Sequence, residues 1–210
     1  MIKFINYTST VGSKIFEVMV ILTEVRFHGR GGQGVVTSAD ILAVACFKEG
    51  HYTLSFPTFG AEKRGTPVAS FLRVSDKPIV LRDEIYNPDY VVVMDPSVIG
   101  VVKVEAGLKD SGILVANFPG SPQELKEIVD TNAKIVTLNA TKLAMEELGR
   151  PITNTAMVGA FVGASGIIKI ETLKETIVEW FKNPKLAEKN IKLVETAYRL
   201  TKGEEAVQID

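Results

Sequence analysis

The apolar positions along the chain change their spacing several times, and each change marks a predicted element. Residues 24–27 alternate between polar and apolar as a strand does, and residues 35–46 carry apolar side chains at helical spacing. Gly50 then stands where a helix is expected to end. Three later runs are apolar almost throughout, which is typical of strands covered on both faces of a parallel sheet: 90–94, 113–116 and 134–138.

Further elements are predicted between and after these runs. Residues 51–56 have a strand-like composition, and residues 68–74 and 79–81 are expected to pair around a turn. Helices are expected from a cap-like start at 121–124 and then over 141–148, 154–168, 171–181 and 184–202. This alternation predicts the α/β class, with a mostly parallel, Rossmann-like sheet covered by helices and a short antiparallel excursion near 68–81.

The chain is expected to form one domain with an appendage at each end. Residues 1–22 are interpreted as a variable N-terminal extension, residues 23–182 as the domain, and residues 183–210 as a C-terminal helix and tail. The longest apolar run of the extension, residues 18–22, is shorter than the core of a signal peptide and far shorter than a membrane span. We therefore expect a cytoplasmic protein with no membrane segment.

Composition and charge narrow the chemistry that this chain can perform. Its 210 residues include 24 basic and 25 acidic side chains, a balance that argues against a dedicated nucleic-acid or anionic-membrane binder. Cys46 is the only cysteine, which excludes an intrachain disulfide and a self-contained iron–sulfur cluster. With His28 and His51 as the only histidines, we expect neither catalytic residues nor a metal site on this chain.

The first candidate site is a glycine motif between the first predicted strand and helix. Gly29, Gly31 and Gly34 have the spacing of a turn that cradles a phosphate at a helix start, and Arg30 adds a positive charge. A dinucleotide site would also need a carboxylate at the end of the second strand, and residues 51–57 contain none. A Walker loop is excluded because Lys and Ser/Thr do not follow the glycines. A tight turn without any ligand remains the simpler alternative.

The second candidate site is the loop over residues 56–65, which should lie beside the glycine motif if their strands are neighbours. Arg30, Lys63 and Arg64 could then form a positive cleft for a phosphate-bearing ligand, with Phe56 and Phe59 as apolar walls. A solvated surface loop, in which an acidic neighbour balances one of these charges, explains the same residues equally well.

Several other residues could have a function, but a structural role is the simplest interpretation of most of them. Asp95 and Asn154 are expected to cap a turn and a helix, and Cys46 to lie in the core. His28 could act as an acid or a ligand, but the sequence offers it no partner. Three glycines at helical spacing predict close helix packing, within the chain or against a partner: Gly159, Gly163 and Gly166.

Two long motifs in this order resemble the gamma subunit of pyruvate:ferredoxin oxidoreductase and related 2-oxoacid:ferredoxin oxidoreductases. They are VRFHGRGGQGVVT at 25–37 and FPTFGAEKRGTPV at 56–68, and residues 88–95 and 154–160 also fit. The resemblance covers roughly residues 23–182. The sequence departs from the family at Lys63, where arginine is common, and in the N-terminal extension.

The resemblance implies a role within a larger enzyme that oxidatively decarboxylates a 2-oxoacid to acyl-CoA and passes electrons to ferredoxin. Thiamine diphosphate, magnesium and [4Fe-4S] clusters would belong to alpha, beta and delta-type subunits, with coenzyme A as a substrate. The residues expected to help bind it are Gly29, Arg30, Gly31, Gly32, Gln33, Gly34, Phe59, Lys63 and Arg64. The alternatives are a stand-alone Rossmann-type nucleotide- or CoA-binding protein or dehydrogenase, and a purely structural assembly subunit.

Overall fold

A computed structural model describes residues 9–11, 14–16, 20–58 and 64–202 of the chain. It contains a six-stranded sheet, a row of helices and a separate antiparallel pair of short strands, β1 (Ser9–Val11) and β2 (Lys14–Phe16). The sheet is built from β3 (Leu22–Arg30), β4 (Tyr52–Pro57), β5 (Pro67–Ser75), β6 (Tyr90–Val93), β7 (Ile113–Asn117) and β8 (Lys134–Leu138). The helices are α1 (Val35–Lys48), α2 (Pro122–Lys126), α3 (Ala140–Leu148), α4 (Asn154–Ser165), α5 (Ile170–Trp180) and α6 (Pro184–Thr201), with a 3-10 turn η1 (Pro96–Val98).

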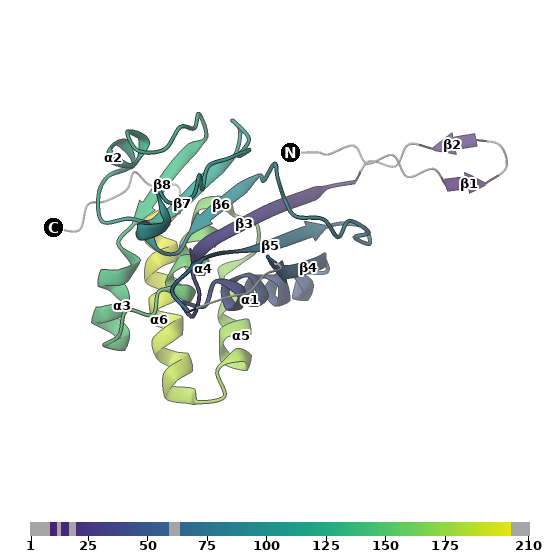
Figure 1. Ribbon diagram of the computed structural model, residues 1–210. Helices are drawn as coiled ribbons and strands as arrows, with labels where there is room; N and C mark the ends of the chain where they lie inside the picture. Colours follow the sequence, from purple (N-terminus) through teal and green to yellow (C-terminus); the bar gives the residue numbers. More distant parts are fainter. Residues whose placement is uncertain (1–8, 12–13, 17–19, 59–63, 203–210) are drawn as a thin grey trace.

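The sheet has the strand order β4-β5-β3-β6-β7-β8 (Figure 1). Strands β3, β6, β7 and β8 run parallel, whereas β5 is antiparallel to both of its neighbours, β3 and β4. The predicted α/β class, with a mostly parallel sheet and an antiparallel excursion, is confirmed. The three apolar runs form β6, β7 and β8, as their composition predicts.

The predicted hairpin of residues 68–74 with 79–81 is wrong in its second half. Residues 79–81 form no strand, and β5 instead pairs along its whole length with β3, from Leu22 opposite Ser75 to Arg30 opposite Pro67. Because β4 occupies the other edge of β5, no free edge remains for residues 79–81. They lie in a long loop across the sheet, in which the carbonyl of Asp83 accepts a hydrogen bond from Arg73 at 2.8 Å.

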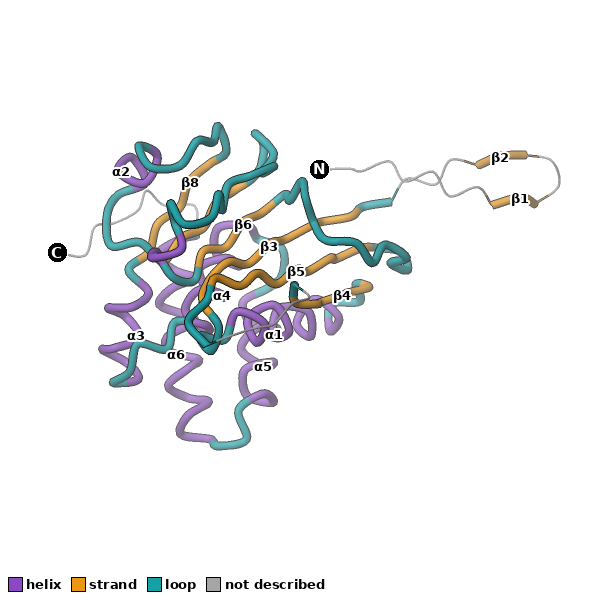
Figure 2. Tube along the Cα trace, in the orientation of Figure 1, coloured by secondary structure: helices purple, strands orange, loops and turns teal. Residues whose placement is uncertain are grey.

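Helices cover mainly one face of the sheet (Figures 1 and 2). On this face α1, α4 and α6 enclose the larger core, which includes Phe27, Cys46 and Phe161. The opposite face is covered by α2, η1 and loops, where Val91, Val93 and other apolar residues form a smaller core. Because β3 and β6 are parallel neighbours, the loops that follow them lie at the same edge of the sheet.

The predicted close packing of the small-residue helix takes place inside the chain. A Cβ on Gly159 would lie 2.5 Å from the Val194 carbonyl oxygen of α6, and one on Gly163 would lie 2.3 Å from Thr201 Oγ1. Gly166, with a φ of 64°, ends the helix instead of packing. The absence of side chains at the first two glycines thus allows α4 and α6 to approach each other closely.

We expect Gly159→Ala to destabilise the protein by about 1–3 kcal/mol, because the added methyl group overpacks the contact with Val194. In an unhindered helix the same change would be stabilising by about 1 kcal/mol. Denaturant unfolding of the purified chain measures the difference, with Glu188→Ala on the exposed side of α6 as a control. A stabilised Gly159→Ala variant would contradict the packing argument.

Candidate functional site

The predicted glycine motif forms a turn between β3 and α1, and we call residues 29–34 the glycine turn. Gly32 has a φ of 89° and Gly34, the N-cap of α1, a φ of 79°, both in the left-handed region that favours glycine. The first amides of α1 have no acceptor within the helix, because its first bond runs from Ser38 N to Gly34 O at 2.9 Å. The turn therefore presents backbone donors at the positive end of a helix.

The end of the second predicted loop lies directly against the glycine turn. Gly31 N donates to Thr66 O at 2.9 Å, and Gly65 N donates to Gly31 O at 3.1 Å. The expectation that these two motifs meet agrees with the structure, but the connection differs. The loop reaches the turn through β5, which lies between β4 and β3, so the strands that precede the two motifs are not neighbours.

Arg30 holds the loops around the turn through its guanidinium. Its guanidinium donates to Ser97 Oγ at 2.6 Å, to Ser97 O at 3.0 Å and to Gly65 O at 2.9 Å. It thereby ties together β3, η1 and the segment that leads into β5. A guanidinium bonded in this way supports the turn, and the contact with a phosphate that the sequence predicted for it stays a prediction.

Arg64 is the exposed cation at the turn. Its Cγ and Nε both lie 3.6 Å from the position that a Cβ on Gly32 would take, so the side chain lies over this glycine. Among the described residues, no side chain forms an ion pair with Arg64. The other two residues predicted in this loop, Phe59 and Lys63, lie outside the described residues.

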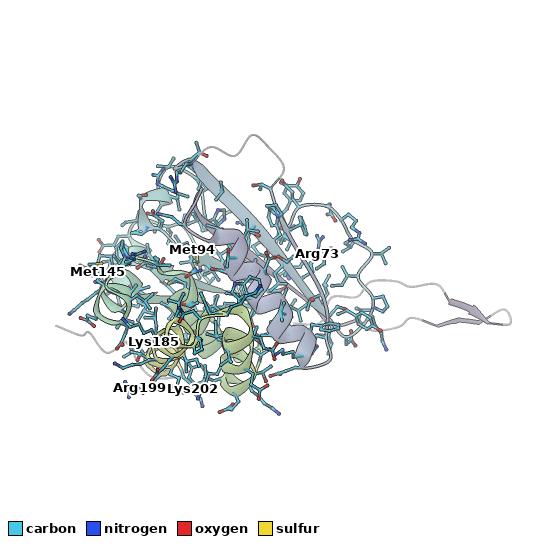
Figure 3. The ribbon with its side chains drawn as sticks, turned by 90° about the horizontal axis from the view of Figure 1, so that it is seen from below. Arg73, Met94, Met145, Lys185, Arg199 and Lys202 are labelled. Carbon is cyan, nitrogen blue, oxygen red and sulfur yellow. The ribbon has the colours of Figure 1, made fainter. Side chains whose placement is uncertain are left out.

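Phe56 does not line the turn as an apolar wall. Its ring packs against Phe71 with the ring centroids 5.2 Å apart, and the Arg73 guanidinium lies 5.8 Å from its centroid. All three side chains belong to strands β4 and β5. Figure 3 labels Arg73 at the sheet, well apart from Lys185 and Arg199 of α6 and from Lys202, which follows this helix.

Gln33 and Asp95 connect the glycine turn to the end of β6. Gln33 Oε1 accepts from Arg30 N at 3.0 Å, and its Nε2 donates to Asp95 Oδ2. Asp95 Oδ1 accepts from Ser97 N at 2.8 Å, which confirms the predicted cap. Burial raises the pKa of the Asp95 carboxyl, but hydrogen bonds from Ser97 and Gln33 and the charge of Arg30 outweigh it and lower this pKa overall.

Asn154 is a site residue whose role the sequence did not reveal. It begins α4 rather than capping it, and its Oδ1 accepts from Thr155 N at 2.9 Å. Its Nδ2 lies 3.1 Å from the position of a Cβ on Gly34 and donates to no described group, although the residue is only 8% exposed. The amide donor of Asn154 thus faces the start of α1. Only the fold could show this, because the two residues are far apart in sequence.

His28 is not available as an acid or a ligand. Its Nε2 accepts a hydrogen bond from Arg26 Nε at 2.9 Å. Burial, and then the positive charge of Arg26, lower the pKa of His28 to about 3, so the imidazole is neutral. The described residues also contain no group of three His, Cys, Asp or Glu side chains that could hold a metal ion. Within them, no helix is both long and apolar enough to cross a membrane.

Comparison with known proteins identifies the family. The model of the pyruvate ferredoxin/flavodoxin oxidoreductase family matches residues 24–200, which include the glycine turn and all six strands of the sheet except the first two residues of β3. This chain belongs to that family. The predicted resemblance to gamma subunits of 2-oxoacid:ferredoxin oxidoreductases is therefore confirmed.

Relatives within this oxidoreductase family are gamma or PorC subunits. The common gamma subunit of the pyruvate/ketoisovalerate oxidoreductases of Thermococcus kodakarensis is 50% identical over 86% of this chain and 97% of its own length. The pyruvate synthase subunit PorC of Methanothermobacter marburgensis is 48% identical over 86% of this chain and 98% of its own. The crystal structure of the pyruvate oxidoreductase subunit PORC from Thermotoga maritima is similar with a TM-score of 0.76 and 31% identity, over 85% of this chain and 96% of that one.

Membership of this family settles what kind of component the chain is. It is an oxidoreductase subunit of the gamma type, and a stand-alone dehydrogenase is not favoured. An iron–sulfur cluster held by this chain alone does not fit its sequence, because a cluster takes about four thiolates and Cys46 is the only cysteine. Cys46 is also buried, so its thiol is not available to a cluster at the protein surface.

Proposed function

We propose that this chain acts as the gamma subunit of a multi-subunit 2-oxoacid:ferredoxin oxidoreductase and that its glycine turn helps to receive coenzyme A. The observation that carries the second part is the exposed side chain of Arg64 over Gly32, beside the first amides of α1. An arginine and a helix start together form a receptor for phosphate oxygens. Coenzyme A is the phosphate-bearing substrate of this class of reaction.

Asn154 adds a second, independent donor to the proposed phosphate site. Its Nδ2 lies 3.1 Å from the position that a Cβ on Gly34 would take and donates to no described group, so it is available to donate to a phosphate oxygen. We assign the contacts to Arg64, the Asn154 amide and the first amides of α1. Arg30 is assigned to the support of the turn because its guanidinium already makes three hydrogen bonds.

The remaining chemistry is assigned to the partner chains. We propose that alpha, beta and delta-type subunits hold thiamine diphosphate, magnesium and the [4Fe-4S] clusters, and that ferredoxin accepts the electrons. A gamma subunit that serves both pyruvate and ketoisovalerate oxidoreductases, as the name of the Thermococcus relative states, suggests that the 2-oxoacid is selected elsewhere. A lone, reduced cysteine is consistent with a cytoplasmic complex.

Within the chain, we assign this role to residues 23–182. Residues 1–22 are proposed as a variable extension, and the greater part of them lies outside the described residues. Residues 183–210 are proposed as a C-terminal helix and tail, of which α6 packs against α4.

Replacing Arg64 with alanine in the assembled complex should raise the KM for coenzyme A about tenfold or more, because a hydrogen bond to a charged group contributes about 1.5–3 kcal/mol. The kcat at saturating coenzyme A should stay close to the parent value. Steady-state kinetics of the purified complex measures both constants, with Arg82→Ala, at an exposed arginine in the loop after β5, as the matched control. An unchanged KM in an intact complex would leave only a structural role for this loop.

A further inference from the structure

The side chains of Gln33 and Asp95 are not among the groups assigned to the phosphate contacts, but their hydrogen bonds fix the shape of the glycine turn. We propose that Gln33 and Asp95 are a pair of positioning residues that hold this turn in its phosphate-receiving conformation before coenzyme A binds. The proposal rests on the proposed function, because the conformation of the turn matters to turnover only if the turn receives a ligand.

The first argument is that the hydrogen bonds form a closed ring. Arg30 and Gln33 are bonded twice, through Arg30 N to Gln33 Oε1 at 3.0 Å and Gln33 N to Arg30 O at 3.1 Å. Gln33 continues to Asp95, Asp95 to the backbone amide of Ser97, and Ser97 returns to the Arg30 guanidinium. A displacement of any member therefore disturbs the others.

The second argument is that the cap of η1 does not need this ring. One oxygen of Asp95, Oδ1, accepts from Ser97 N and completes the cap. The other, Oδ2, accepts from Gln33 on a segment that is 62 residues away in sequence. A capping aspartate without a further role would leave that oxygen to solvent, since Asp95 is not fully buried.

The third argument concerns the flexibility of the turn itself. Gly32 and Gly34 have positive φ angles, and glycine loses more conformational entropy on ordering than any other residue. A turn composed largely of glycine would be ordered only at the expense of ligand affinity unless other groups held it in place. The ring anchors it at Arg30 and Gln33, on either side of Gly31 and Gly32, and such preorganisation increases affinity without any contact to the ligand.

The fourth argument is electrostatic. A free carboxylate beside a phosphate site would repel the ligand, but the charge of Asp95 is balanced by Arg30, which is bonded to Ser97 within the same ring. Arg30 and Asp95 thus neutralise each other. The net positive charge that remains at the turn among the described residues is that of Arg64.

An exchange of the two groups tests this pairing. Gln33→Glu places two carboxylates against each other, and Asp95→Asn places two amides there, whereas the double variant Gln33→Glu/Asp95→Asn restores one amide and one carboxylate in reversed positions. In the assembled complex we expect Gln33→Glu to raise the KM for coenzyme A about tenfold or more, since facing like charges are strongly unfavourable. Asp95→Asn should raise the KM less, and the double variant should return it to within about threefold of the parent.

The readouts separate positioning from a general loss of structure. We expect kcat at saturating coenzyme A and complex yield to change little in all three variants, and Asp130→Asn, at an exposed aspartate after α2, to match the parent. Single variants with an unchanged KM, or a double variant no better than Gln33→Glu, would overturn the proposal. A loss of complex yield or kcat as large as the change in KM would also overturn it.

The Arg64→Ala variant distinguishes this failure from that of the proposed function. Suppose that Arg64→Ala raises the KM for coenzyme A, but the double variant Gln33→Glu/Asp95→Asn has a KM as high as that of Gln33→Glu. The turn then binds the ligand, and the proposal of a positioning pair is wrong. If neither Arg64→Ala nor the exchange variants alter the KM, the proposed function fails at this turn, and the positioning proposal fails with it.

Discussion

Replacing Arg73 with methionine is expected to destabilise the protein by about 3–5 kcal/mol, because it removes the guanidinium that pairs with a buried carboxylate. Arg73 is 1% exposed and Glu24 3% exposed, and Arg73 Nε lies 3.0 Å from Glu24 Oε1. The same guanidinium donates to the carbonyl of Asp83 at 2.8 Å, so the loop that crosses the sheet also loses an anchor. Denaturant unfolding of the purified chain measures the loss.

The double variant Glu24→Gln/Arg73→Met is the matched control for this ion pair. It removes both charges of the pair, and replacement of a buried pair by neutral groups is often close to neutral in stability. We expect it to recover most of the loss. The interpretation is wrong if Arg73→Met costs less than about 1 kcal/mol, or if the double variant is the less stable of the two.

His28 is expected to make the protein sensitive to acid. An exposed histidine takes up its proton near pH 6.5, whereas the pKa of His28 in the fold is about 3, first through burial and then through Arg26. The unfolded chain therefore binds a proton that the folded chain does not. The contribution to stability is fully present above pH 6.5 and decreases towards pH 3, by up to about 1.4 kcal/mol for each pH unit.

His28→Gln removes this titration and keeps an acceptor, because a glutamine oxygen can replace Nε2 as the partner of Arg26. Unfolding free energies measured at several pH values between 3.5 and 7 should decline less steeply for the variant than for the parent. Equal slopes in the two proteins would show that His28 is not held neutral in the fold.

The sequence was most informative where the local composition is sufficient to determine the structure. Strands β6 and β7 are predicted closely because a strand covered on both faces must be apolar at successive positions. The glycine turn is predicted because positive φ angles between a strand and a helix leave glycine as the favoured residue. The small-residue helix was predicted three residues too long, since Gly166 ends it.

The sequence was misleading where distant segments decide the outcome. Residues 75–78 resemble a hairpin turn, but the nine-residue pairing of β5 with β3 uses residues that are far from this turn in sequence. The charge of Arg30 is visible in the sequence, whereas its bonds to Ser97, 67 residues away, are not. The amide of Asn154 behind Gly34 likewise depends on the packing of α4 against α1.

The buried thiol of Cys46 has a practical consequence for labelling experiments. Burial, and then the charge of Glu49, raise its pKa to about 12, so very little thiolate forms at neutral pH. Since this is the only cysteine, maleimide reagents should leave the native chain unmodified. A cysteine introduced at Lys77, beyond the end of β5 that lies away from the glycine turn, would then carry a fluorophore at a single defined position. The assembly of the complex could be followed by this signal without removing any native residue of the core.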